Sequence, residues 1–104
     1  AHLVGVEYDK VNTGFPTPRP IEIIAHSPVG CEGRPSHQAT AYHTVASGAG
    51  VFATGTMRWV EALDAKGDGR GGGNHGLDAR AGALTTRVTE NLLRVFAAGP
   101  AGAT

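Results

Sequence analysis

The pattern of apolar and polar side chains predicts four short strands, because successive side chains of an extended chain point to opposite faces. Leu3–Asp9 and Ile21–His26 alternate, Ala41–Val45 is rich in Thr, Tyr and Val, and Val51–Ala53 is a short apolar run. In the first segment, Gly5, Glu7 and Asp9 share one face and Tyr8 lies on the other. Residues 12–20 and 27–38 carry Pro and Gly at short intervals, which predicts loops.

A period near 3.6 residues predicts two helices. The shorter one, Met57–Leu63, follows the fourth strand through a glycine turn and has Thr56 as its expected N-cap. The longer one, Leu84–Ala98, is amphipathic, with Thr85 or Thr86 as its expected cap and Gly99–Pro100 as its end. The residues that predict one apolar face on the shorter helix are Trp59, Val60 and Leu63.

This order of elements favours a mixed α/β fold in a single domain, residues 1–104. We expect a partial sheet of about four strands, covered by the C-terminal amphipathic helix and accompanied by the short helix. Loops and not crossover helices join the first three strands, so at least part of the sheet should be antiparallel. Residues 65–76 contain six glycines among polar residues, which predicts a mobile connector.

Composition narrows the class of protein. The chain has 9 basic and 9 acidic side chains and a formal net charge of zero, which argues against nucleic-acid binding and against a polybasic membrane patch. The apolar runs are far shorter than the roughly 20 residues of a membrane-spanning helix, and no export signal is visible. The single cysteine forms no internal disulfide. We therefore expect a cytoplasmic protein.

Glu7 is the first candidate for chemistry. The missing side chain at Gly5, on the same face, leaves room for another group to approach this carboxylate. Glu7 is then a candidate acid–base residue or a carboxylate that orients a substrate. The alternative is an ordinary strand-end carboxylate that pairs with Lys10 or an arginine.

The turn from the fourth strand into the short helix is the second candidate. A strand that enters a helix through Gly55 presents free N–H groups near Thr54 and Thr56, where a carboxylate or oxyanion can bind. Arg58 and Trp59 can line the same crevice. Such turns also occur in any α/β domain, in which case Trp59 belongs to the core and Arg58 to the solvent.

Other polar residues give weaker patterns. Glu22 and His26 share a strand face and can form a hydrogen-bonded pair, although a half-exposed polar face looks the same. Cys31 lacks the strand-to-helix turn of a nucleophile elbow, and its spacing from His37 and His43 matches no common zinc site. The glycine-rich segment fits neither a calcium loop nor a phosphate-binding loop. We expect no metal site in this chain.

Four stretches resemble one known family. They are Leu3–Asp9, Pro16–Ile21, Gly48–Trp59 and Thr86–Arg94. Through them, nearly the whole chain is similar to the C-terminal region of the large (beta) subunit of N,N-dimethylformamidase. The resemblance implies an amidohydrolase acting on linear amide C–N bonds, which hydrolyses a small N-substituted formamide to formate and an amine.

The resemblance also bears on cofactor and site residues. It implies a mononuclear iron in the full-length enzyme, held by two tyrosines and a glutamate upstream of the matching region, and no cofactor in this chain. Tyr8 and Tyr42 are therefore not assigned as iron ligands. Glu7 matches, by local pattern, a carboxylate that approaches the family's active site, and is the expected catalytic residue. The expected substrate-binding residues are Thr54, Gly55, Thr56 and Arg58.

The resemblance finally implies a larger assembly. The C-terminal region of such subunits is similar to glutamine amidotransferase-like domains of about 200 residues, so this chain would supply only a C-terminal part. Its expected partners are the remainder of the large subunit or another copy of the chain, and a small amide. The isolated chain should be inactive. The alternatives are a non-catalytic structural or oligomerisation module, and a carbohydrate-linked domain of the trehalose-utilisation type.

Overall fold

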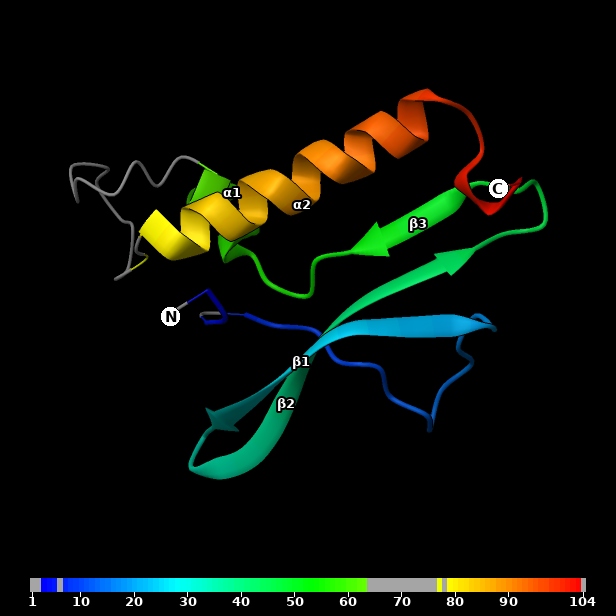
Figure 1. Ribbon diagram of the computed structural model, residues 1–104. Coiled ribbons are helices and arrows are strands. Elements are labelled where there is room, and N and C mark those ends of the chain that lie inside the picture. The colour runs from blue at the N-terminus through cyan, green and yellow to red at the C-terminus, as the bar shows by residue number, and fades with distance from the viewer. Residues whose placement is uncertain (1–2, 6, 64–76, 78, 104) are drawn as a thin grey trace.

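A computed structural model describes residues 3–5, 7–63, 77 and 79–103 of the chain. The elements are β1 (Ile21–Cys31), β2 (Arg34–Thr44), β3 (Gly50–Ala53), α1 (Arg58–Leu63), α2 (Ala79–Ala97) and a short 3-10 helix (Ala101–Ala103). The three strands form one antiparallel sheet in the order β1-β2-β3. The long helix α2 runs across one side of the sheet, and α1 lies beside its first turns (Figure 1). The predicted mixed α/β class and the antiparallel pairing are confirmed.

The segment predicted as the first strand does not form a strand. The described part of the chain therefore has three strands where about four were expected. In place of a strand at Leu3–Asp9, the structure has isolated bridges, one of which pairs Tyr8 with Thr56. The backbone of Asp9 enters the fork where β2 and β3 separate. Its N–H donates to the carbonyl of Gly55 at 3.0 Å, and its carbonyl accepts from the N–H of Ala39 at 2.9 Å. This segment is therefore held by both neighbours without forming a full strand.

The loop predicted over residues 27–38 is instead the end of a long hairpin. The strands β1 and β2 continue to Cys31 and Arg34 and are joined by Glu32 and Gly33, whose φ values are 50° and 75°. Positive φ at both positions is typical of the two-residue turn that matches the twist of antiparallel strands. The prolines that suggested a loop are accommodated within this hairpin.

A bulge in β1 changes which side chains share a face. The register shifts between Ile23 and Ala25, so Glu22 pairs with Tyr42 whereas His26 pairs with Ala39. Tyr42 and Ala39 lie on opposite faces of β2 because they are an odd number of residues apart. Glu22 and His26 therefore do not share a face, which argues against the hydrogen-bonded pair that the sequence left open. His26 stacks on His37 with ring centroids 4.4 Å apart.

Both predicted helices are present, with one correction to each. On α1 the buried residue is Ala62, while Val60 is 74% exposed, so the predicted apolar face points partly to solvent. The helix α2 begins at Ala79 and not near Thr85. Thr85 is an interior residue whose hydroxyl donates to the carbonyl of Ala81 at 3.0 Å, so it does not act as an N-cap.

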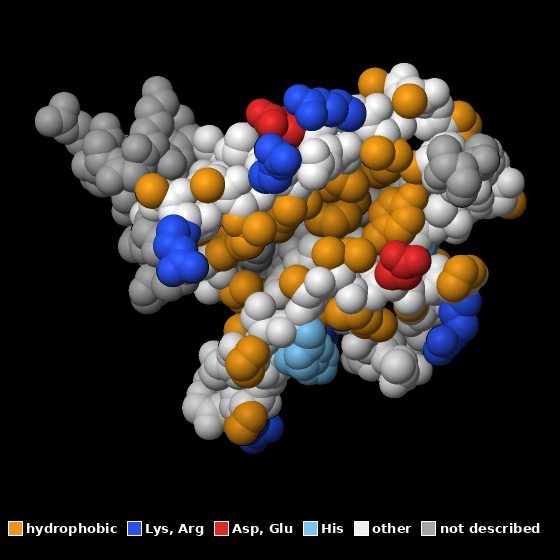
Figure 2. Space-filling view, viewed as in Figure 1, with side chains coloured by type: hydrophobic (Ala, Val, Ile, Leu, Met, Phe, Trp, Pro, Cys, Tyr) orange, Lys and Arg blue, Asp and Glu red, His pale blue; other side chains and the backbone are white. Residues whose placement is uncertain are grey.

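The core formed by the described residues is small. The buried hydrophobic residues are Ala39, Ala41, Ala62, Leu77 and Ala81. Among them Leu77 packs with Ala62 and Ala81, with Leu3 partly buried against the cluster. Many larger hydrophobic side chains remain exposed, and they gather along α2 and over the adjoining strands (Figure 2).

Two further expectations concern the glycine-rich segment and membrane-spanning helices. The mobile connector expected at residues 65–76 lies outside the described residues. Among the residues that are described, none of the helices has the length and apolar character needed to cross a membrane.

Candidate functional site

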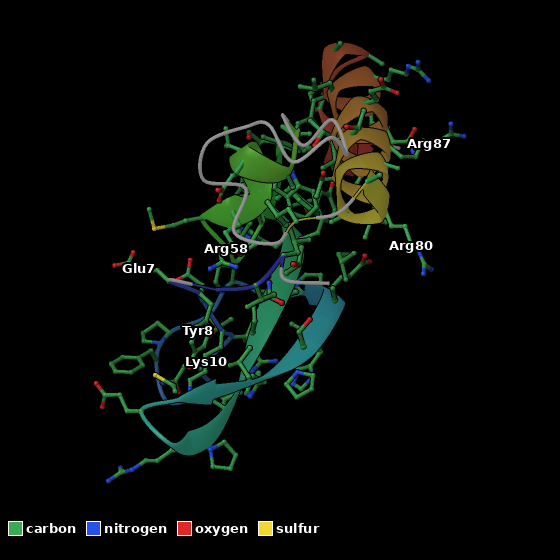
Figure 3. All side chains as sticks on the ribbon, turned by 90° about the vertical axis from the view of Figure 1, so that its left-hand side faces the viewer. Glu7, Tyr8, Lys10, Arg58, Arg80 and Arg87 are labelled. Atoms are coloured by element: carbon green, nitrogen blue, oxygen red, sulfur yellow. The ribbon has the colours of Figure 1, made fainter. Side chains whose placement is uncertain are left out.

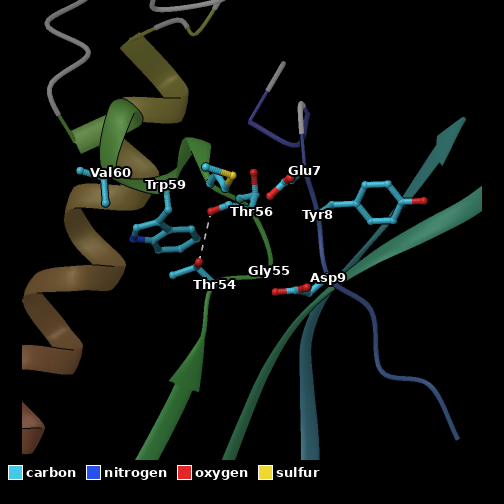
Figure 4. A pocket seen from close by; sticks show the side chains of 9 residues that line it. Glu7, Tyr8, Asp9, Thr54, Gly55, Thr56, Trp59 and Val60 are labelled. Atoms are coloured by element: carbon cyan, nitrogen blue, oxygen red, sulfur yellow. Dashed lines mark hydrogen bonds between the residues drawn. The ribbon is translucent and has the colours of Figure 1, made fainter. Parts of the chain in front are cut away.

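A pocket of about 340 Å³ opens between the N-terminal segment, the turn after β3 and the start of α1 (Figure 4). It is lined by Glu7, Tyr8, Asp9, Thr54, Gly55, Thr56, Met57, Trp59 and Val60. Four of the five residues expected at the site from the sequence therefore line one pocket. The fifth, Arg58, is not among the lining residues.

The turn at the bottom of the pocket is fixed from below by β2. The Thr54 carbonyl accepts a hydrogen bond from the Thr40 hydroxyl at 2.8 Å and one from Nε2 of Gln38 at 3.1 Å. Gln38 is 1% exposed, and its Nε2 also donates to the Thr40 hydroxyl. Because a buried polar group costs free energy unless it is hydrogen-bonded, these hydrogen bonds fix the position of the turn relative to β2.

Only glycine fits at position 55. Its φ is +71°, in the left-handed region, and a Cβ there would collide with the carbonyl oxygen of Ala39 and with Gln38 Nε2. The close approach lets the Gly55 carbonyl accept from the N–H of Asp9. The sequence signal for this turn, a glycine between a strand and a helix, is thus confirmed as a structural requirement.

Thr56 is the N-cap of α1, as expected. Its hydroxyl accepts from the N–H of Arg58 at 3.2 Å and donates to the carbonyl of Leu3 at 2.9 Å. The N–H of Trp59 donates to the Thr56 carbonyl at 3.4 Å. The N–H groups of Arg58 and Trp59 therefore already donate hydrogen bonds to Thr56. A ligand in the pocket would contact side chains and not these N–H groups.

Glu7 and Asp9 face the pocket, while the ring of Tyr8 projects to the opposite side (Figure 4). This alternation is the one expected for an extended segment. Both carboxylates belong to exposed residues and lie across from the hydroxyl-bearing turn. Asp9 was not predicted as a site residue, although its position on the same face as Glu7 was a usable signal.

Arg58 lies against the N-terminal segment and not among the residues that line the pocket. The guanidinium lies against Gly5, where an added Cβ would be 2.7 Å from Cζ of Arg58. Gly5 thus does make room for another group next to the Glu7 segment, and that group is Arg58 (Figure 3). Arg58 is partly buried, which argues against the alternative that places it in solvent.

Trp59 forms an apolar wall of the pocket and connects α1 to α2 and β3. Its indole Nε1 donates to the Thr89 hydroxyl of α2 at 3.0 Å, and its ring meets Phe52 of β3 edge-on at 5.7 Å between centroids. Together with Met57 and Val60, it adds an apolar surface to the pocket. From the sequence, Trp59 could either line this crevice or belong to the core, and the other two were not identified as site residues.

The remaining candidates lie elsewhere. Cys31 is exposed at the tip of the hairpin. Within the described ranges, no group of three or more His, Cys, Asp or Glu side chains is arranged to hold a metal ion. What the pocket offers is two carboxylates, threonine hydroxyls and an indole surface, which together can accept hydrogen bonds or a proton and cover small alkyl groups.

Comparison with known proteins identifies the family. A family model described as "N,N-dimethylformamidase beta subunit-like, C-terminal" matches residues 1–75, which include every residue that lines the pocket. The match ends before α2, so the resemblance expected for the terminal helix lies outside it. No curated protein and no solved structure gives a significant match. The chain therefore belongs to the N,N-dimethylformamidase beta subunit-like C-terminal family.

Proposed function

We propose that this chain supplies one wall of the amide-binding site of an amidohydrolase, with Glu7 as its acid–base residue. The observation that carries the proposal is the position of Glu7 and Asp9 opposite the Thr54–Thr56 turn, in a pocket of about 340 Å³. That volume falls in the range of small-molecule sites. The whole pocket lies within the residues that match the family.

The chemistry follows from the lining groups. Hydrolysis of a formamide adds water across the C–N bond: the water oxygen bonds to the formyl carbon, and the amine leaves with the proton. A carboxylate such as Glu7 can take a proton from the attacking water and return it to the departing nitrogen. The apolar surface of Trp59, Met57 and Val60 suits N-alkyl groups.

The described residues do not fit the iron site that the family resemblance implies. A ligand set of two tyrosines and a glutamate would need Tyr8 beside Glu7, but the Tyr8 ring projects away from the two carboxylates (Figure 4). The second tyrosine, Tyr42, lines a different pocket with Phe52. We therefore assign the iron ligands to another part of the enzyme. A glutamine amidotransferase-like sheet is likewise a proposal about the complete subunit.

The direct test is the Glu7→Gln variant in the complete subunit. We expect the turnover number for formate release to fall by about a hundredfold or more, because general acid–base catalysis typically contributes at least this factor. Glu32→Gln, at the exposed hairpin tip, is the matched control and should leave turnover unchanged. Near-normal turnover of Glu7→Gln would exclude the catalytic role.

A second candidate function is a structural module of a larger subunit. The specific observation in its favour is a contrast in burial. Among the described residues, Leu77 is the largest buried hydrophobic side chain, whereas Leu84 and Leu93 are exposed. This reading predicts that Glu7→Gln keeps full turnover while substitutions on the exposed apolar surface disrupt assembly. The same variant therefore separates the two functions.

A further inference from the structure

An apolar groove lies on the face of the sheet that α2 covers, away from the candidate amide site. Its volume is about 320 Å³. Tyr42 and Phe52 form its floor, and Val88, Leu92 and Val95 of α2 form one wall. Figure 2 shows this band of hydrophobic side chains open to solvent between α2 and the strands. Ile24, the residue at the β1 bulge, lines the other side and is 53% exposed.

A row of arginines runs along α2 beside this groove. Arg80, Arg87 and Arg94 are all exposed and follow one another at seven-residue intervals. Seven residues bring a helix back to nearly the same direction, with a drift of about 20°, so the three side chains form one stripe. On the helix surface this stripe borders Leu84 and Val95. Arg80 and Arg87 project from α2 toward the side from which Figure 2 is viewed (Figure 3).

We propose that this groove binds an amphipathic α-helix of a partner chain whose flank carries acidic residues at seven-residue intervals. Apolar side chains of that helix would cover the groove, and its carboxylates would meet the three arginines. The proposal names an interaction surface and does not depend on the amide site, because no groove residue lines the candidate pocket.

The spacing of the arginines favours a helix as the occupant. Consecutive guanidinium positions are about 10.5 Å apart along the axis of α2, which a second helix reproduces with carboxylates seven residues apart. An extended strand covers the same distance in about three residues, but side chains an odd number of residues apart point to opposite faces. A strand therefore cannot present successive carboxylates to the whole stripe.

The charges argue against three other occupants. In a second copy of this chain, α2 would bring its own arginines, with Glu90 as the acidic residue among them, and α1 would bring Glu61. Neither offers an acidic stripe. A nucleic acid or anionic membrane is disfavoured because both are extended anionic surfaces and the chain has no net positive charge.

The test uses synthetic helical peptides of about 20 residues, labelled for fluorescence anisotropy. Both carry the same leucines at helical spacing, and they differ only in having Glu or Lys at every seventh position. We expect the Glu peptide to bind the chain at least about tenfold more tightly than the Lys peptide. The triple variant R80E/R87E/R94E should reverse this preference.

Controls keep the result interpretable. R80Q/R87Q/R94Q removes the charges without adding new ones and should give equal affinity for the two peptides. Arg34→Glu, at the distant hairpin end of β2, should change nothing, and circular dichroism checks that each variant keeps its fold. Equal binding of both peptides to the unchanged chain, no binding of either, or closure of the groove by self-association in sedimentation would each overturn the proposal.

Discussion

Gly55 couples the backbone of the candidate site to the sheet beneath it. Its φ of +71° and its contact with the Ala39 carbonyl and Gln38 Nε2 both exclude a side chain. We expect Gly55→Ala to lower the free energy of unfolding by about 3 kcal/mol or more, because backbone strain and a steric clash add. Urea denaturation monitored by circular dichroism measures the loss.

Gly33 provides the matched control for that prediction. Its φ is +75°, but an added Cβ there would meet nothing within 4 Å. Gly33→Ala should therefore lower the free energy of unfolding only through backbone strain, by about 1 kcal/mol. Equal losses at the two positions would show that Gly55 does not make the close approach described.

At this scale, much of the candidate site could be predicted. Glu7 and the turn residues follow from two local signals, the alternation of an extended segment and a glycine between strand and helix. Asp9 lies on the same face of the extended segment as Glu7, so the same alternation could have identified it. The position of Arg58 against Gly5 could not be predicted, because the two residues are far apart in the sequence and no local pattern links them.

At the scale of elements, one hydrogen bond joins the two helices next to the pocket. Trp59 Nε1 donates to Thr89 Oγ1 at 3.0 Å. We expect Trp59→Phe and Thr89→Val each to lower the free energy of unfolding, with a shared part of about 1 kcal/mol. A double-mutant cycle measures that part as the amount by which the combined loss falls short of the sum. Strict additivity would mean that this bond does not stabilise the packing of α1 on α2.

The β1–β2 hairpin shows why element boundaries were mispredicted. Counted from the two-residue turn, Pro28 and Pro35 fall in non-hydrogen-bonded pairs of the ladder, where a missing N–H removes no bond between the two strands. Reading prolines as loop markers was therefore misleading here. The pair Glu32–Gly33 between two extended segments was the signal that could have identified the turn.

For the whole molecule, stability should depend on a few small contacts. Leu77 is 4% exposed and packs with Ala62 and Ala81, whereas Leu93 on α2 is 62% exposed. Leu77→Ala should lower the free energy of unfolding by about 2–4 kcal/mol. The same substitution at Leu93 should change it by less than about 0.5 kcal/mol. Comparable losses in thermal denaturation would mean that the exposed face of α2 is covered in solution.

Assembly of the whole molecule was the hardest level to predict from sequence. The mixed α/β class follows from element order, but the insertion of Asp9 between Ala39 and Gly55 joins three segments distant in the chain. Nothing in the alternation of residues 3–9 indicates that their pairing stops at isolated bridges. Such long-range pairing depends on where β2 and β3 diverge.

The proposed function requires that the pocket formed by Glu7, Asp9 and the Thr54–Thr56 turn binds a small amide. Titration of the isotopically labelled chain with N,N-dimethylformamide, followed by two-dimensional NMR of its amides and of the Trp59 indole, tests it most directly. We predict saturable chemical-shift changes concentrated at residues 7–9, 54–57 and the Trp59 indole. In Glu7→Gln, a higher amide concentration should be needed to reach half-saturation. Shifts that are absent, that spread evenly over the chain, or that concentrate in the groove beneath α2 would show that this pocket does not bind the amide.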